Sequence, residues 1–370
     1  MEQRAHIYYF DYLRILSLLS VIFMHAASGP LRAAPDLNWM FLNLCTSFAF
    51  TAVPLFLMMS GHLLLSSKKT LDVSVLFRKR LPRLIFPLIV WTVIASAWLV
   101  LQTGSFTLPA FAAQLFGAFS QPVMVHFWYM YTLIAIYLIS PLLYAGLHGL
   151  DNKGKLLIFV LIGLVSFQTM CRQLAPASVD RYINFDIINK MQFFGGHLCT
   201  FVLGYYLGGS KRTVPNWLLI GLICVCLAGI TAGTYLLTVR HGEYDATLQN
   251  QSAGFEILLA SCIFLLFKQN LNKKVFLLHD LLRPIVSLSL PIYLAHNIVL
   301  SVLSYLGIRA AGFLDTVGIT VLVLVICLAG TMAATYIRPL CFPVNGLRAS
   351  DARISCRWRI RKKSDFESPV

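Results

Sequence analysis

Hydrophobic residues gather in long segments along the whole chain, and short polar connectors separate them. A helix needs roughly 20 mostly apolar residues to cross the hydrocarbon core of a bilayer. The pattern therefore predicts an all-α integral membrane protein with about ten transmembrane helices. The fifth and eighth segments are short, which allows a tilted or re-entrant helix there. The ten predicted spans are 10–29, 41–65, 84–103, 127–147, 156–171, 191–209, 217–239, 252–267, 285–306 and 316–337.

The segments follow one another without a low-complexity linker, so we expect one membrane domain. We assign a single transmembrane bundle to 1–340 and a basic cytoplasmic tail to 341–370. The basic residues around 353–363 are typical of charge that fixes topology and attracts anionic lipid. A specific binding partner for this tail is the less favoured alternative.

The composition excludes several other classes of protein. Hydrophobic residues make up 58% of the chain and charged residues only 12%, whereas a soluble domain carries about 25% charged residues. This deficit excludes a soluble enzyme or a nucleic-acid-binding domain as the main body. The expected surroundings are a lipid bilayer, with no nucleic acid, and a homo-oligomer stays open. The nine cysteines form no CxxC pair and mostly lie in apolar segments, so we expect no disulfide framework and no metal site.

Lysine and arginine are distributed unevenly between the two sets of connectors. If the N-terminus is cytoplasmic, 24 of the 30 Lys and Arg residues fall on the cytoplasmic side. Positive residues concentrate in cytoplasmic loops of membrane proteins. With an even number of spans, the sequence predicts that both termini are cytoplasmic.

The first segment ends in small residues at 26–29, which resemble a signal-peptidase site. It also contains Asp11, Arg14 and His25, whereas the hydrophobic region of a signal peptide is apolar throughout. We therefore expect this segment to be retained as a span.

Ionisable side chains inside a membrane span are costly and usually mark a functional site. Arg14 and His25 lie eleven residues apart in the first span, which brings them to within about 20° of the same helix face, roughly 16 Å apart. Asp11 precedes Arg14 by three residues and can pair with it. The alternative is an interfacial arginine together with a hydrogen-bonded core histidine.

Three polar side chains follow one another in the ninth span. Tyr293 and His296 are three residues apart, and Ser289 lies seven residues before His296. His296 has a depth similar to that of His25, so the two histidines can meet across a cavity. The alternative is a hydrogen bond that only packs helices together.

A basic connector leads into the third span, where Arg80 and Arg83 border the membrane. Two guanidiniums at this spacing suit bidentate phosphate recognition. The alternative is topogenic charge alone. In the preceding span, Pro54 and Gly61 favour a kink or a close approach of helices.

Several motifs together resemble the membrane acyltransferase-3 family over nearly the whole chain. They are Asp11-Tyr-Leu-Arg14 with His25, Val53-Pro-Leu-Phe-Leu-Met-Met-Ser-Gly61, Arg80-x-x-Arg83, His126-Phe-Trp128 continuing to Tyr137 and Pro141, and Ser289-Leu-Pro-Ile-Tyr293-Leu-Ala-His296. Within the family the chain is most similar to stand-alone polysaccharide O-acetyltransferases of the enterobacterial-common-antigen type. It departs from the family pattern at His62 and Ile15, which leaves the substrate subgroup open.

The resemblance implies a multi-pass enzyme of the bacterial inner (cytoplasmic) membrane that transfers acetyl from acetyl-CoA to a sugar hydroxyl of a glycan. It implies catalytic roles for His25, Arg14 and His296, with His25 as the general base and His296 as the competing candidate. It implies acyl-CoA binding by Arg80, Arg83, Arg14 and Ser60, and substrate binding by Trp128, Tyr137, Tyr293 and Asp11. An outer Trp128 is also typical of an aromatic belt.

Three further questions stay open at the level of sequence. Direct acyl transfer is favoured over an acylated residue, because no hydroxyl–histidine pair within one span suggests an activated nucleophile. A polytopic transporter or flippase for a polysaccharide precursor is the alternative function, although no inverted repeat supports it. A signalling membrane domain is a third, less favoured alternative.

Overall fold

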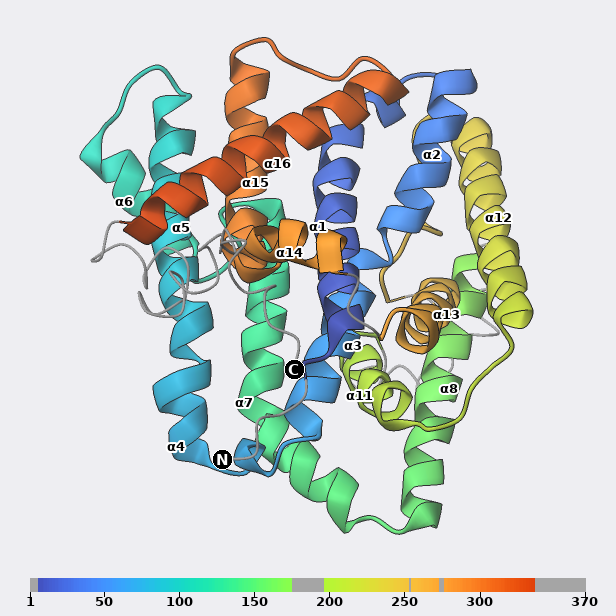
Figure 1. The fold of residues 1–370 in the computed structure, drawn as a ribbon. Coiled ribbons are helices and arrows are strands. Elements are labelled where there is room, and N and C mark those ends of the chain that lie inside the picture. Colours follow the sequence, from blue (N-terminus) through green and yellow to red (C-terminus); the bar gives the residue numbers. More distant parts are fainter. Residues whose placement is uncertain (1–5, 175–195, 253, 273–275, 337–370) are drawn as a thin grey trace, which may run out of the picture.

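The computed structural model describes residues 6–174, 196–252, 254–272 and 276–336, and these ranges contain helices and no strands (Figure 1). The predicted boundary at 340 and the basic tail lie outside the described residues. The long helices are α1 (Tyr8–Ala27), α2 (Leu37–Ala49), α3 (Ala52–Leu65), α5 (Pro82–Leu101), α7 (Trp128–Gly149), α8 (Asn152–Leu174), α11 (Gly196–Gly209), α12 (Asn216–His241), α13 (Gly254–Asn270), α15 (Ser289–Tyr305) and α16 (Phe313–Tyr336). Shorter elements are η1 (Pro30–Arg32), η2 (Lys68–Thr70), α4 (Val73–Val75), η3 (Leu76–Arg80), α6 (Leu108–Gly117), η4 (Val125–Phe127) and α14 (Phe276–Ser287).

The predicted membrane class is confirmed, because six helical stretches of the described chain are long and apolar enough to cross a bilayer. They are 8–27, 37–65, 73–101, 125–149, 216–241 and 313–336. The other four predicted spans coincide with α8, α11, α13 and α15. Whether each of these four crosses the membrane stays a prediction.

Helix α1 lies in the middle of the molecule (Figure 1) and packs against α2, α3, α15 and α16. Its side chains Leu13, Leu18 and Ile22 are fully buried. A helix surrounded in this way presents its polar residues to protein rather than to lipid. The central position of α1 explains how Arg14 and His25 can both contribute to an interior site.

The predicted close approach at Gly61 is confirmed. A Cβ atom at Gly61 would lie 1.8 Å from the backbone oxygen of Phe201, and one at Gly204 would lie 2.2 Å from the Cα of Met58. Small residues on both helices therefore let the backbones of α3 and α11 touch. The predicted second span is broken at 50–51, between α2 and α3, shortly before Pro54.

We expect Gly61→Ala to destabilise the protein by about 1–3 kcal/mol or more, because the added methyl group has no space against the Phe201 carbonyl. Gly229→Ala is the matched control, since nothing lies within 4 Å of a Cβ added at that helical position. Thermal unfolding of both variants in detergent checks this expectation. Equal unfolding temperatures for the two variants would contradict the close packing.

The connectors define two opposite faces (Figure 1). The upper face carries the connectors 28–36 and 306–312 and the C-terminal ends of α5 and α12. The lower face carries the connectors 66–81, 150–151 and 210–215. The basic connector with Arg80 thus lies opposite the C-terminal end of α1.

The charge distribution predicts that the upper face is extracytoplasmic. We expect a single cysteine introduced at the exposed Glu243 to react with a membrane-impermeant maleimide in intact cells, in a background without the native cysteines. A cysteine at the exposed Lys79, on the lower face, should react only after permeabilisation. The reverse pattern would invert the predicted topology.

Candidate active site

Three histidines from different parts of the chain meet inside the bundle. His25 lies in the last turn of α1, His126 in η4 before α7, and His296 in α15. Their ring centroids are 4.5 Å apart for His126 and His296, 5.2 Å for His25 and His296, and 6.0 Å for His25 and His126. The predicted meeting of His25 with His296 is therefore present, and His126 joins it.

Hydrogen bonds fix the protonated nitrogen of two of these rings. The Nδ1 of His296 lies 2.5 Å from the carbonyl oxygen of Tyr293, and the Nε2 of His126 lies 3.2 Å from that of Leu294. A carbonyl only accepts, so each of these nitrogens is the donor. Asn297 Nδ2 donates to the remaining nitrogen of His126 at 3.3 Å. The Nε2 lone pair of His296 then has no hydrogen-bond partner in the described part of the chain.

Tyr293 ties the histidine cluster together. Its hydroxyl donates to the backbone oxygen of His126 at 2.5 Å, and its ring packs 5.5 Å from that of Tyr129. The predicted substrate-binding residue Tyr293 therefore holds η4 against α15. Tyr293 is buried and also lines the cavity beside the histidines, and its predicted role in substrate binding stays a prediction.

A cavity of about 460 Å³ lies beside the histidines and reaches the upper face. Its wall includes His25, His126 and Asn297, and its rim includes the exposed Ser28 and Arg32. This volume falls within the range of small-molecule binding sites, about 300–1,000 Å³. The cavity gives a substrate access to His25 from the upper face.

The predicted substrate-binding residue Trp128 also lines this cavity. Its ring centroid lies 5.0 Å from that of His197 on α11, at an interplanar angle of 32°. Trp128 thus belongs to the site, in addition to lying near a membrane interface.

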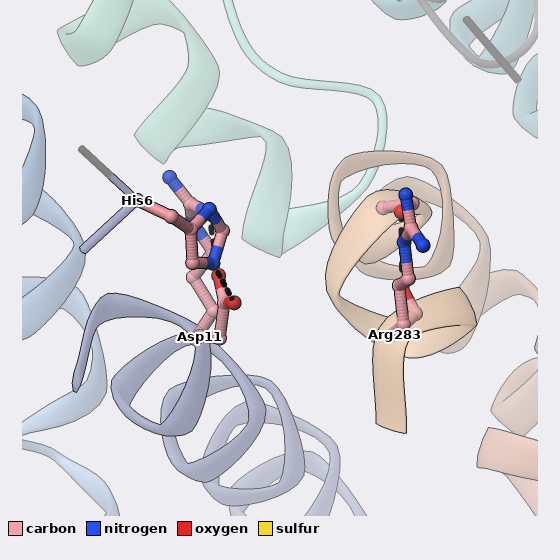
Figure 2. A network of polar contacts seen from close by, with 5 residues as sticks. His6, Asp11 and Arg283 are labelled. Atoms are coloured by element: carbon pink, nitrogen blue, oxygen red, sulfur yellow. Dashed lines mark hydrogen bonds and ion pairs between the residues drawn. The ribbon is translucent and has the colours of Figure 1, made fainter. Parts of the chain in front are cut away.

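A second group of predicted residues lies toward the lower face, near the start of α1. The Oδ1 of Asp11 lies 3.4 Å from Nη1 of Arg14, and the Oδ2 of Asp11 lies 2.6 Å from Nε2 of His6. Figure 2 shows His6 and Asp11 in contact, with Arg283 on the neighbouring helix α14. A cavity of about 240 Å³ is lined by Asp11, Arg14 and His62. His62, which departs from the family pattern, therefore borders the arginine.

The two arginines of the basic connector have different surroundings. Arg80 is half-buried and donates from Nη1 to the hydroxyl of Thr70 at 2.8 Å, whereas Arg83 is exposed. Tyr137 lies near both Arg80 and Arg14. Arg80 therefore shares a polar site with Arg14, one turn away from the surface position of Arg83.

Tyrosines link the arginine group to the histidine group. The ring of Tyr129 packs 5.5 Å from that of Tyr293, and Tyr129 also lies near Tyr137. The predicted cofactor-binding residue Ser60 forms a side-chain hydrogen bond with Tyr129. Buried tyrosines therefore lie between the Arg80 and Arg14 group and the three histidines.

The loop after α12 closes the other side of the histidine cavity, and its own hydrogen bonds hold it. Burial alone would raise the pKa of Asp245, but hydrogen bonds from Thr247 and His241 keep that pKa below its usual value. The hydroxyl of Tyr244 donates to Gln249, and burial raises the pKa of this tyrosine above its usual range. Tyr244 therefore lines the cavity as a neutral hydroxyl whose proton is donated to Gln249.

His126 and Asn297 were not among the sequence-predicted site residues. The available signal is the His126-Phe-Trp128 motif, which belongs to the pattern that resembles the family, whereas the aromatic-belt alternative concerns Trp128 alone. Among the described residues, no group of three or more His, Cys, Asp or Glu is arranged to hold a metal ion. Both nitrogens of His126 already have protein partners.

The match to a family model covers residues 7–336 and identifies an acyltransferase domain. The chain belongs to the acyltransferase-3 family and is a multi-pass membrane acyltransferase. The comparison with curated proteins and the comparison with solved structures each found no match.

Proposed function

We propose that this acyltransferase moves an acetyl group from cytoplasmic acetyl-CoA to a hydroxyl of a cell-envelope glycan at the outer side of a bacterial inner membrane. One observation carries this proposal: Arg80 and Arg14 lie together toward one face of the bundle, and three histidines lie beside a cavity that reaches the opposite face. An enzyme that joins a donor on one side of a membrane to an acceptor on the other needs binding groups toward both faces.

The donor would enter from the lower face. CoA carries several phosphates, and guanidiniums bind phosphate through two parallel hydrogen bonds. Arg80 lies where these phosphates would reach the bundle, and Arg14 lies deeper in the same polar group. The pantetheine arm would then follow Ser60 and Tyr129 toward His25, over a distance on the order of 16 Å along α1.

His25 would act as the general base. As the acceptor hydroxyl attacks the thioester carbonyl, His25 takes its proton, the new C–O bond forms and the C–S bond breaks. The proton then passes to the departing CoA thiolate, giving the ester and CoA. The ring of His296 lies 5.2 Å from that of His25 between centroids, and its Nε2 has no hydrogen-bond partner in the described part of the chain, so His296 remains the competing candidate for the base.

Direct transfer fits the site better than a covalent acyl-enzyme. Among the described residues, no serine, threonine or cysteine side chain is hydrogen-bonded to the ring of His25, His126 or His296. A covalent route needs a nucleophile next to a base.

The proposal is tested by incubating the purified full chain in detergent with acetyl-CoA and a panel of glycans. We expect CoA release that increases when an acceptor is added, with acetyl ester appearing on the glycan by mass spectrometry. A transporter or flippase would leave acetyl-CoA intact under the same conditions, and this outcome would contradict the proposal.

A further inference from the structure

A second cavity, an open surface depression of about 620 Å³, adjoins the histidine cavity. The two share Phe50, Trp128, Ala246 and Gln251 in their walls. The second cavity lies farther from the three histidines, none of which lines it. Its position suits a part of the acceptor that binds without reacting.

The lining of this cavity is polar but carries no Asp, Glu, Lys or Arg among its described residues. Amide and hydroxyl side chains dominate it: Thr247, Gln249, Asn250, Gln251 and Ser252. Amides both donate and accept, as sugar hydroxyls do. The rings of Trp128 and His197 add a flat aromatic wall, against which the C–H face of a sugar can pack.

The polar groups of this cavity are held in place before any ligand binds. Gln249 donates to Asn43 Oδ1 and to Ser47 Oγ, each at 2.9 Å. The Oδ1 of Asn250 accepts from the backbone N–H of Ser252 at 2.9 Å. This bond occupies the oxygen of Asn250 and leaves its NH₂ group as the donor toward a ligand. A fixed site loses less entropy when it binds.

We infer that the acceptor is a glycan of at least two sugar units, of which the second is uncharged. The reacting sugar occupies the histidine cavity, and the next sugar occupies the second cavity between Asn250, Gln251 and the Trp128–His197 wall. This inference rests on the proposed function and adds the length of the acceptor and the charge of its second sugar. An anionic second sugar would find no cation among the described residues that line the second cavity, since Arg32 lines only the histidine cavity.

The test is a calorimetric titration of the full chain in nanodiscs with neutral sugars of increasing length. The probes are glucose, cellobiose and cellotetraose, the corresponding N-acetylglucosamine series, and an oligogalacturonate as the anionic comparison. In at least one neutral series we expect the disaccharide to bind at least about tenfold more tightly than the monosaccharide. The oligogalacturonate should bind no better than the monosaccharides.

Two variants test whether the second cavity supplies the extra affinity for the disaccharide. Asn250→Asp keeps the acceptor for the Ser252 N–H but removes the NH₂ donor, and His197→Ala removes half of the aromatic wall. Each should reduce the gain from the second sugar to less than about threefold, while the monosaccharide affinity and the unfolding temperature stay close to those of the wild-type chain. The exposed Gln121, which lines neither cavity, provides the control Gln121→Ala.

Equal affinity for mono- and disaccharides in every neutral series, no neutral binding at all, or preferred binding of the oligogalacturonate would each overturn the inference. A different result would contradict the proposed function: a wild-type chain that binds neutral glycans but does not consume acetyl-CoA. The two failures are therefore distinguishable in one set of preparations.

Discussion

Replacing His25 by alanine is expected to reduce acyl transfer by about 10²–10⁴-fold, the usual contribution of a general base. His25 lines the cavity that reaches the upper face and lies on the same helix as Arg14, which faces the proposed donor route. Acetyl-CoA binding should stay unchanged, because its phosphates would bind at the opposite end of the bundle. Turnover and acetyl-CoA affinity, measured on the same preparation, check this expectation.

His296→Ala is the necessary comparison, since His296 is fully buried and its ring lies close to that of His25. If His25→Ala keeps near-native turnover while His296→Ala loses it, the roles of the two histidines are reversed. If both variants keep turnover, neither residue is the base. His25→Gln retains a polar side chain, and its unfolding temperature separates a catalytic loss from a folding defect.

Replacing Arg80 by alanine is expected to weaken acetyl-CoA binding by roughly ten- to a hundredfold, the effect of losing one charge-assisted phosphate contact. Acceptor binding should change much less. The half-buried Arg80 interacts with the same tyrosine as Arg14, and its guanidinium is held by Thr70. Calorimetry with CoA and with acetyl-CoA measures this effect.

Arg83→Ala is the matched control, because Arg83 has the same charge three residues away but is exposed. The sequence predicts that both arginines contribute, and the structure favours the larger effect at Arg80. Arg80→Lys keeps the charge and loses the fork of donors, so it should recover only part of the affinity. If Arg80→Ala binds CoA as tightly as the wild-type chain, the basic connector does not bind CoA and its charge only fixes the topology.

The position of the predicted catalytic residues on α1 follows from helix geometry. An eleven-residue spacing returns a helix to nearly the same face, and the sequence alone therefore predicts that Arg14 and His25 share an interior side. The similar depth of His25 and His296 predicts their meeting, and the structure brings their rings together. Their chemical roles stay predictions.

The third histidine was not predicted, for a physical reason. His126 lies in a single 3-10 turn at the start of the stretch 125–149, ahead of α7, so no α-helical periodicity indicates the direction of its side chain. Its place depends on the hydrogen bond from Tyr293, which is 167 residues away in the chain. Long-range contacts of this kind do not appear in a local pattern.

The different surroundings of Arg80 and Arg83 could not be predicted from their spacing. The spacing predicts a pair of guanidiniums that recognise phosphate together. The structure ends a π-helix at Arg80 and begins α5 with Pro82, so the two residues belong to different helical segments. The change of helix type turns Arg80 toward the interior and leaves Arg83 at the surface.

The most direct test of transfer across the membrane uses proteoliposomes in which the chain is reconstituted in a known orientation. Radiolabelled acetyl-CoA is supplied only on the side of the lower face, and a neutral glycan acceptor only on the side of the upper face. We predict labelled glycan on the upper-face side, no label there with His25→Ala, and no transfer when the donor and the acceptor exchange sides. Acetylation that requires donor and acceptor on the same side would contradict a donor route from Arg80 to His25.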